Sequence, residues 1–284
     1  MSEELLVARV APHYWEEPCI SGEKGSGTVF FSGCNLRCVY CQNAKIAAGR
    51  VGKRITIPEL ADAFLRLQAE GCHNINLVTP SHFVPQIAQA LRIAKGQGLH
   101  IPIVYNTSSY ECEQTLQQMD GLVDIYLADL KYLSKELSKK YSHAADYPET
   151  ATAAIAEMVR QTGGIIYEDE KEHTLVSDAE EYPDGAMMKR GVIVRHLLLP
   201  GQTGEAKRVI SYLYETYQDR IAISILNQYT PLSHVRDYPE LDRRVTEEEY
   251  EEVVNYAIEL GIGHGFLQEG EAVGESFIPE FEGE

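Results

Sequence analysis

The chain has 284 residues, of which 44% are apolar and 24% are charged, and its formal net charge is −18. These proportions are typical of a globular protein, and they exclude a collagen-like, coiled-coil or wholly disordered chain. No run of about 18 apolar residues occurs and the N-terminus lacks a secretory pattern, so we expect a cytoplasmic protein with no membrane partner. The excess of acidic residues argues against a nucleic-acid partner.

Short apolar runs alternate with helical patterns along the chain. The runs are rich in β-branched residues and bounded by Gly, Pro or polar residues, which predicts buried strands at 27–32, 76–79, 101–105, 123–128, 192–199 and 221–226. Apolar residues at helical spacing predict helices at 58–70, 84–95, 111–119, 150–161, 205–217 and 247–260, the last with Thr246 as its N-cap.

This alternation predicts an α/β fold with a parallel sheet and right-handed crossovers. Six strand–helix units indicate a partial (β/α)6 barrel over residues 27–230, after an N-terminal extension at 1–26. Residues 164–189 break the rhythm, and we expect them to form an inserted excursion that contains a hairpin. Residues 231–284 are expected to pack on the barrel as an acidic helix and tail. In such sheets the chemistry lies past the carboxyl ends of the strands.

Negative charge is concentrated in two of these segments. Residues 239–284 hold 14 acidic and 2 basic side chains, and residues 167–185 hold 8 acidic and 1 basic. The remainder of the chain is close to neutral. We expect both acidic segments to be solvent-exposed, although the excursion would also suit the selection of a substrate.

Three of the six cysteines, Cys34, Cys38 and Cys41, lie within eight residues directly after a predicted strand. Reduced thiolates packed this closely need a cation to offset their repulsion. A structural zinc site usually has four ligands from paired motifs, and no second pair exists here, whereas a four-iron cluster held by three thiolates keeps one iron open. The spacing therefore favours an iron–sulfur cluster over zinc.

The motif CxxxCxxC with Tyr40 before its third cysteine resembles the radical S-adenosylmethionine (radical SAM) superfamily. Its surroundings, GTVFFSGCNLRCVYCQN at 27–43, are similar to pyruvate formate-lyase activating enzymes and more closely to the PflX-like iron–sulfur proteins. The segments WEEPCISG (15–22), LVTPSH (77–82) and VRHLLLPG (194–201) are also similar to that subgroup. The resemblance implies a partial barrel of the radical SAM type that extends over residues 27–230.

The resemblance also implies the cofactors and the chemistry. A [4Fe–4S] cluster on Cys34, Cys38 and Cys41 would bind S-adenosylmethionine at its open iron and cleave it reductively to a 5′-deoxyadenosyl radical. That radical would abstract hydrogen from a protein or peptide, most simply a glycine of a glycyl radical enzyme. Flavodoxin or ferredoxin would supply the electron. The alternatives are a peptide-modifying or small-metabolite radical SAM enzyme and a zinc-stabilised binding protein.

Cofactor contacts are expected where strands end. Alternation places Asp129 and Lys131 on one face, and Lys131 matches the family's contact to the cofactor carboxylate. Asn106 and Asp129 match two positions of a monovalent-cation site in the activating enzymes. Those enzymes usually have an Asp at the position that Asn106 occupies in this chain. The alternative for Asp129 and Lys131 is an ion pair that only satisfies the strand end.

Two further positions complete the predicted site. Arg195 lies inside an apolar strand, where a buried guanidinium needs an anionic partner, and it matches the family's cofactor-contacting arginine. Ser81 and His82 replace the Gly-Gly-Glu motif of the activating enzymes, so we expect them to contact the cofactor; the alternative is that Ser81 caps a helix. His196 is expected to face the other way in a structural role.

Overall fold

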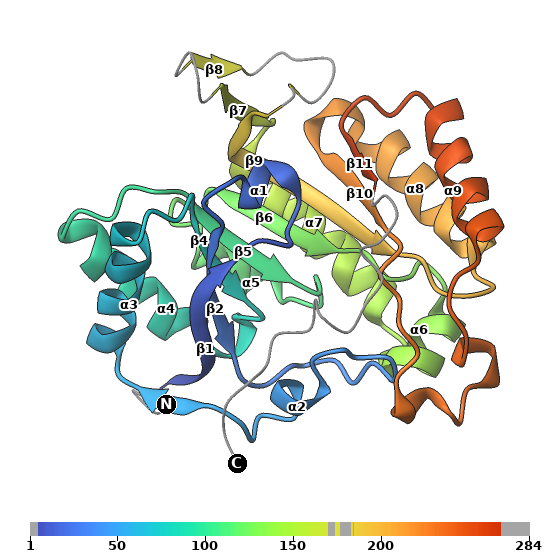
Figure 1. Cartoon of the computed structure of the whole chain (residues 1–284), viewed down its shortest axis with the longest axis horizontal. Helices are drawn as coiled ribbons and strands as arrows, with labels where there is room; N and C mark the ends of the chain where they lie inside the picture. Colours follow the sequence, from blue (N-terminus) through green and yellow to red (C-terminus); the bar gives the residue numbers. More distant parts are fainter. Residues whose placement is uncertain (1–4, 170–173, 177–182, 184, 268–284) are drawn as a thin grey trace.

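A computed structural model describes residues 5–169, 174–176, 183 and 185–267. Its centre is an open sheet in the order β11-β10-β9-β6-β5-β4-β2-β1-β3, and neighbouring strands from β2 to β11 are parallel (Figure 1). The parallel strands are β2 (Ser26–Phe31), β4 (Ile75–Val78), β5 (Ile103–Thr107), β6 (Ile125–Asp129), β9 (Met187–Leu197), β10 (Ala222–Leu226) and β11 (Gly265–Leu267). The six predicted strands and the α/β partial-barrel fold are therefore confirmed.

Helices follow most of these strands, as the crossover rule requires. The longer ones are α3 (Ile57–Ala69), α4 (Val84–Gly96), α7 (Tyr147–Thr162), α8 (Thr203–Tyr217) and α9 (Glu247–Glu259). The shorter ones are α1 (Pro18–Ser21), α2 (Ala44–Ala47), α5 (Glu113–Gln117) and α6 (Lys135–Ser142). Thr246 caps α9, as predicted, in a capping box with Glu249.

The first residues of the chain extend the sheet beyond its parallel part. Strand β1 (Leu5–His13) pairs antiparallel with β2, and β3 (Lys53–Ile55) pairs antiparallel with β1 at the sheet edge. Helix α1 then lies over the inner face of the sheet (Figure 1). Its Cys19 and Ile20 are fully buried in one apolar cluster with Val104, Leu127 and Ile193. The N-terminal segment thus fills the inner face of the sheet.

The excursion contains the hairpin that the sequence predicts. Strands β7 (Ile166–Asp169) and β8 (Thr174–Val176) pair antiparallel, and β7 also pairs with the start of β9. The rest of the acidic excursion lies largely outside the described residues, as does the acidic tail from residue 268. Within the described part of the chain, no helix is long and apolar enough to cross a bilayer.

Candidate functional site

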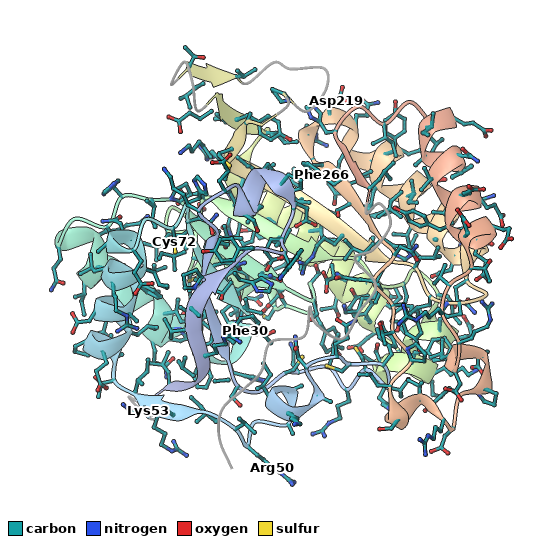
Figure 2. The ribbon with its side chains drawn as sticks, viewed as in Figure 1. Phe30, Arg50, Lys53, Cys72, Asp219 and Phe266 are labelled. Carbon is teal, nitrogen blue, oxygen red and sulfur yellow. The ribbon has the colours of Figure 1, made fainter. Side chains whose placement is uncertain are left out.

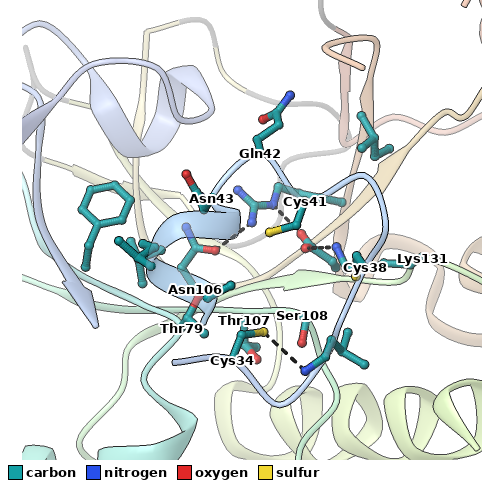
Figure 3. Close-up of a pocket in the computed structure, with 18 of the residues that line it drawn as sticks. Cys34, Cys38, Cys41, Gln42, Asn43, Thr79, Asn106, Thr107, Ser108 and Lys131 are labelled. Atoms are coloured by element: carbon teal, nitrogen blue, oxygen red, sulfur yellow. Dashed lines mark hydrogen bonds and ion pairs between the residues drawn. The ribbon is translucent and has the colours of Figure 1, made fainter. Parts of the chain in front are cut away.

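A pocket lies at the carboxyl ends of the parallel strands, and most of the predicted site residues line it (Figure 3). The loop after β2 contributes all three clustered cysteines, and the ends of β5, β6 and β9 contribute polar and charged side chains. The predicted residues that line the pocket are Cys34, Cys38, Tyr40, Cys41, Asn106, Asp129, Lys131 and Arg195. Phe30, Thr79, Leu226 and Gln228 complete much of the remaining wall.

The cysteine loop begins at a glycine that the local backbone requires. Gly33 has a φ of +105°, and a Cβ there would stand 3.1 Å from the His82 ring, so a side chain would be both strained and crowded. The Gly33 and Cys34 amides donate to the Ile46 and Ala47 carbonyls of α2, at 2.8 and 3.1 Å. The first cysteine is therefore fixed by backbone hydrogen bonds to the helix that follows the motif.

Helix α6 holds the second half of the cysteine loop. The Val39 amide donates to the Tyr141 carbonyl at 2.8 Å. Ser142 Oγ lies 3.1 Å from Cys38 Sγ and 3.1 Å from the Tyr132 hydroxyl, which donates to the Tyr40 hydroxyl at 2.7 Å. Tyr40 is thereby anchored by its hydroxyl and buried, rather than left free on the pocket wall.

The three cysteines are free thiols that are partly buried at the pocket wall. Burial raises the pKa of Cys34, and burial together with the neighbouring Cys38 raises the pKa of Cys41 to about 11. A bound cation would offset this cost and favour the ionised forms of Cys34 and Cys41. No three His, Cys, Asp or Glu side chains of the described chain are arranged to hold a single metal ion. Three sulfur donors spread around one pocket suit a cluster bound at three corners.

A partly buried ionic network forms the floor of the pocket. Asp129 and Arg195 are register partners on β6 and β9, and Asp129 Oδ1 accepts from Arg195 Nε at 2.9 Å while Asp129 Oδ2 accepts from Lys131 Nζ at 2.7 Å. Burial alone would raise the pKa of Asp129, but Lys131 and Arg195 hold that pKa below its usual value. Asp129 and Lys131 therefore form the ion pair that the sequence offered as an alternative, and both still line the pocket.

Glu16 joins this network and was missed by the sequence analysis. Its Oε2 accepts from Arg195 Nη1 at 3.1 Å, and its Oε1 accepts from the side-chain amides of Asn76 and Asn106, at 3.0 and 3.2 Å. Arg195 Nη2 also donates to Asn106 Oδ1 at 2.7 Å. All three guanidinium nitrogens of Arg195 thus have protein acceptors. Only the subgroup-like segment at 15–22 could have directed attention to Glu16.

Ser81 and His82 lie beside the pocket and are not among the residues that line it. They form a single 3₁₀ turn (Ser81–Phe83), and Ser81 Oγ donates to Glu111 Oε1 at 2.5 Å. Ser81 makes no side-chain cap either, because Phe83 takes the N-cap position of α4. Cofactor contacts by these two residues stay a prediction that this arrangement does not favour.

His196 has the structural role that alternation predicts. Its ring is buried, and Nδ1 lies 2.8 Å from the Leu130 carbonyl oxygen. Burial lowers the pKa of His196, so the ring is held in its neutral form. His196 is therefore a core residue behind the strand that presents Arg195 to the pocket.

Comparison with known proteins finds a family model that matches just under half of the chain. Residues 28–166 match the family model described as the radical SAM superfamily. An uncharacterised protein of Methanocaldococcus jannaschii, MJ0674, is 26% identical over 238 residues, which are 82% of this chain and 62% of that protein. The chain thus spans about three fifths of the length of this relative.

Solved structures share the fold at low sequence identity. Methylornithine synthase (PylB) superimposes with a TM-score of 0.54 at 14% identity, over 82% of this chain and 62% of that one. Streptococcus suis SuiB, bound to its precursor peptide SuiA, gives 0.53 at 13% identity, over 84% of this chain and 47% of that one. These likenesses extend the shared fold well beyond the segment matched by the family model.

Proposed function

We propose, on the premise that residues 28–166 form a domain of the radical SAM superfamily, that this chain is a radical enzyme acting on a protein or peptide. The superfamily uses a [4Fe–4S] cluster and S-adenosylmethionine. When bound, these cofactors supply a 5′-deoxyadenosyl radical that abstracts hydrogen and leaves as 5′-deoxyadenosine. The supporting observation is that three cysteines and a partly buried Asp129–Lys131–Arg195 network share one pocket.

The chain's own residues would bind and orient the cofactors. Cys34, Cys38 and Cys41 are the only clustered sulfur ligands of the sequence, and they would hold the cluster at three corners. Lys131 and Arg195 would face the carboxylate of S-adenosylmethionine. Because Asp129 and Glu16 already fix the two cations, these donors are oriented before the cofactor arrives, which lowers the entropic cost of binding.

Other groups would shield the reacting atoms. Phe30, Leu36 and Leu226 line the pocket with apolar surface, and Gln42 closes one side by donating to the Gln228 carbonyl at 2.9 Å. A carbon radical that abstracts hydrogen needs no protein acid or base, but it must be kept from other reactions. The role of these side chains would therefore be to shield the radical, and the proposed reaction requires no catalytic triad.

The first experiment tests the reaction and the substrate class together. Anaerobically loaded protein is reduced, supplied with S-adenosylmethionine, and mixed with either the protein fraction or the small-molecule fraction of cells grown in deuterated medium. We expect deuterium to enter 5′-deoxyadenosine with the protein fraction. Deuterium from the small-molecule fraction alone would favour a small-metabolite enzyme, and no 5′-deoxyadenosine at all would refute the proposed function.

The activating-enzyme version has its own test. A glycyl radical enzyme incubated with the reduced protein and S-adenosylmethionine should acquire the paramagnetic resonance signal of a backbone glycyl radical. The matched control replaces the target glycine by alanine in that partner. If a competent, reduced preparation gives no signal, the substrate is another peptide and the resemblance to activating enzymes ends at the shared chemistry.

A further inference from the structure

The segment around the cysteine motif has the opposite charge to the rest of the chain. Residues 24–58 contain six basic residues and no acidic one, in a chain that has 43 acidic residues and a net charge of −18. All six are exposed, and we call four of them, which lie on the cysteine loop or in the segment after it, the cation rim: Arg37, Lys45, Arg50 and Lys53. The rim is therefore a local positive surface on an acidic protein.

The rim is available to a partner. Arg37, Lys45 and Arg50 form no ion pair with any residue that the structure describes, and Figure 2 shows Arg50 and Lys53 reaching outward along one edge of the molecule. Here the positive charge is left to act on an external molecule.

The rim lies outside the pocket, although it belongs to the same loop. Leu36, Cys38 and Asn43 line the pocket, whereas the rim side chains next to them in sequence do not. Arg37 lies between two of the cysteines, and Lys45 is on α2, whose carbonyls accept from the Gly33 and Cys34 amides. A molecule on the rim would contact the outer side of the loop that holds the cysteines, without entering the substrate pocket.

The charge distribution would also orient such a partner. Helix α9 carries six glutamates and no basic residue, and it lies on the other side of the molecule from α2 and β3 (Figure 1). An acidic protein would be attracted to the rim and repelled by α9. Charge arranged in this way steers diffusional encounters and can raise association rates by about 10–1,000-fold at low salt.

We propose that the cation rim is the docking surface of an acidic, low-potential electron-carrier protein. The inference rests on the proposed function, because reductive cleavage of S-adenosylmethionine consumes one electron. The reduced carrier would lose one electron and the cluster held by the cysteines would gain it, with no proton transferred. Electron transfer between proteins slows steeply with distance, and the rim places the carrier against the cysteine loop itself.

Reduction kinetics test this docking surface. Loaded, oxidised protein is mixed at low ionic strength with the hydroquinone form of a bacterial flavodoxin, and the loss of cluster absorbance is followed by stopped flow. The pair Arg37→Glu and Lys45→Glu should lower the second-order rate constant at least about tenfold. The difference should fade near 1 M salt, where the screening length is about 3 Å. Reduction by methyl viologen radical, a small cation, should not slow.

A matched control pair and a second pair of rim substitutions complete the test. Arg66→Glu with Arg92→Glu makes the same change in net charge on exposed positions of α3 and α4, and it should keep the rate within about twofold of wild type. Arg50→Glu with Lys53→Glu changes the rim beyond the cysteines, and it decides the matter if the first pair loses iron. Wild-type rates in both rim pairs, or an equal loss in the control pair, would overturn the proposal.

These outcomes are separable from those of the proposed function. Protein that accepts electrons from flavodoxin through the rim but leaves S-adenosylmethionine intact would refute the proposed reaction alone. Protein that cleaves S-adenosylmethionine after viologen reduction, but whose rim variants accept flavodoxin electrons normally, would refute the docking surface alone.

Discussion

Two carboxylates near neighbouring strand ends, the partly buried Asp129 and the buried Glu111, are stabilised in opposite ways. Asp129 is held by the cations Lys131 and Arg195, and its pKa lies below its usual value. Glu111 accepts from the hydroxyls of Ser81, Thr107 and Tyr105, at 2.5, 2.6 and 3.3 Å, and burial raises its pKa despite these bonds. Asp129 lines the pocket and Glu111 does not. Charged partners thus keep one carboxylate ionised where a charged ligand would bind, and neutral partners hold the other in the framework.

Removal of the shared cation should have the largest effect. Arg195→Met would leave the partly buried Asp129 and Glu16 with one partner fewer each, and we expect a loss of about 3 kcal/mol in the free energy of unfolding, measured by urea denaturation. The matched control is Arg160→Met, which breaks ion pairs of a mostly exposed guanidinium and should cost less than about 1 kcal/mol. Equal losses in the two variants would show that the pocket network is not stabilised as a buried unit.

A pair of amide substitutions compares the two carboxylates directly. Asp129→Asn removes the charge that pairs with two partly buried cations, so it should cost about 2–3 kcal/mol. Glu111→Gln keeps an oxygen that accepts from the three hydroxyls, so it should cost about 1 kcal/mol or less. Urea denaturation at neutral pH measures both losses. If Glu111→Gln proves as costly as Asp129→Asn, the hydroxyl cradle holds an ionised group and the contrast is wrong.

The pH dependence of stability should differ in sign between the same two variants. Asp129, with its folded pKa below the ordinary 3.8, stabilises the wild type above that pH and loses its contribution as the pH falls. Glu111, with its folded pKa above the ordinary 4.5, contributes most below that pH and loses its contribution as the pH rises through the folded pKa. As the pH rises from 3 to 7, the free energy of unfolding of wild type should therefore increase relative to that of Asp129→Asn. Over the same range it should decrease relative to that of Glu111→Gln. If the free energies of unfolding of wild type and both variants change with pH in the same way, the predicted pKa directions of both carboxylates are wrong.

Much of the fold follows from local patterns in the sequence. The six predicted strands are short apolar runs bounded by Gly or polar residues, and a strand buried on both faces needs only that signal. Strand β1 was missed, although its buried and partly buried residues begin in alternation, because it is an antiparallel addition to the sheet outside the strand–helix rhythm. Helix α6 was missed because its eight residues are mostly polar, and only Ser138, Tyr141 and Ser142 in it are buried.

The site divides in the same way. Cys34, Cys38 and Cys41 are clustered in sequence and carry their own signal. Arg195 was found because a guanidinium inside an apolar strand needs an anionic partner, and Asp129 and Lys131 because alternation places them on one face. Glu16 is 179 residues from Arg195, and no periodicity or spacing links the two. Glu111 and Ser142 act through hydrogen bonds to Ser81 and Cys38 across the fold. Such contacts depend on strand order and loop path, which a single sequence does not specify.

The most direct test of the account is the iron content of anaerobically reconstituted protein, read together with 5′-deoxyadenosine formed from S-adenosylmethionine under reductant. Wild type and Cys112→Ala, which removes an exposed cysteine outside the pocket, should each bind about four irons per chain and form 5′-deoxyadenosine. Cys38→Ala should lose both. Zinc in place of iron in the wild type, or iron and cleavage retained by Cys38→Ala, would contradict the assignment of the three cysteines.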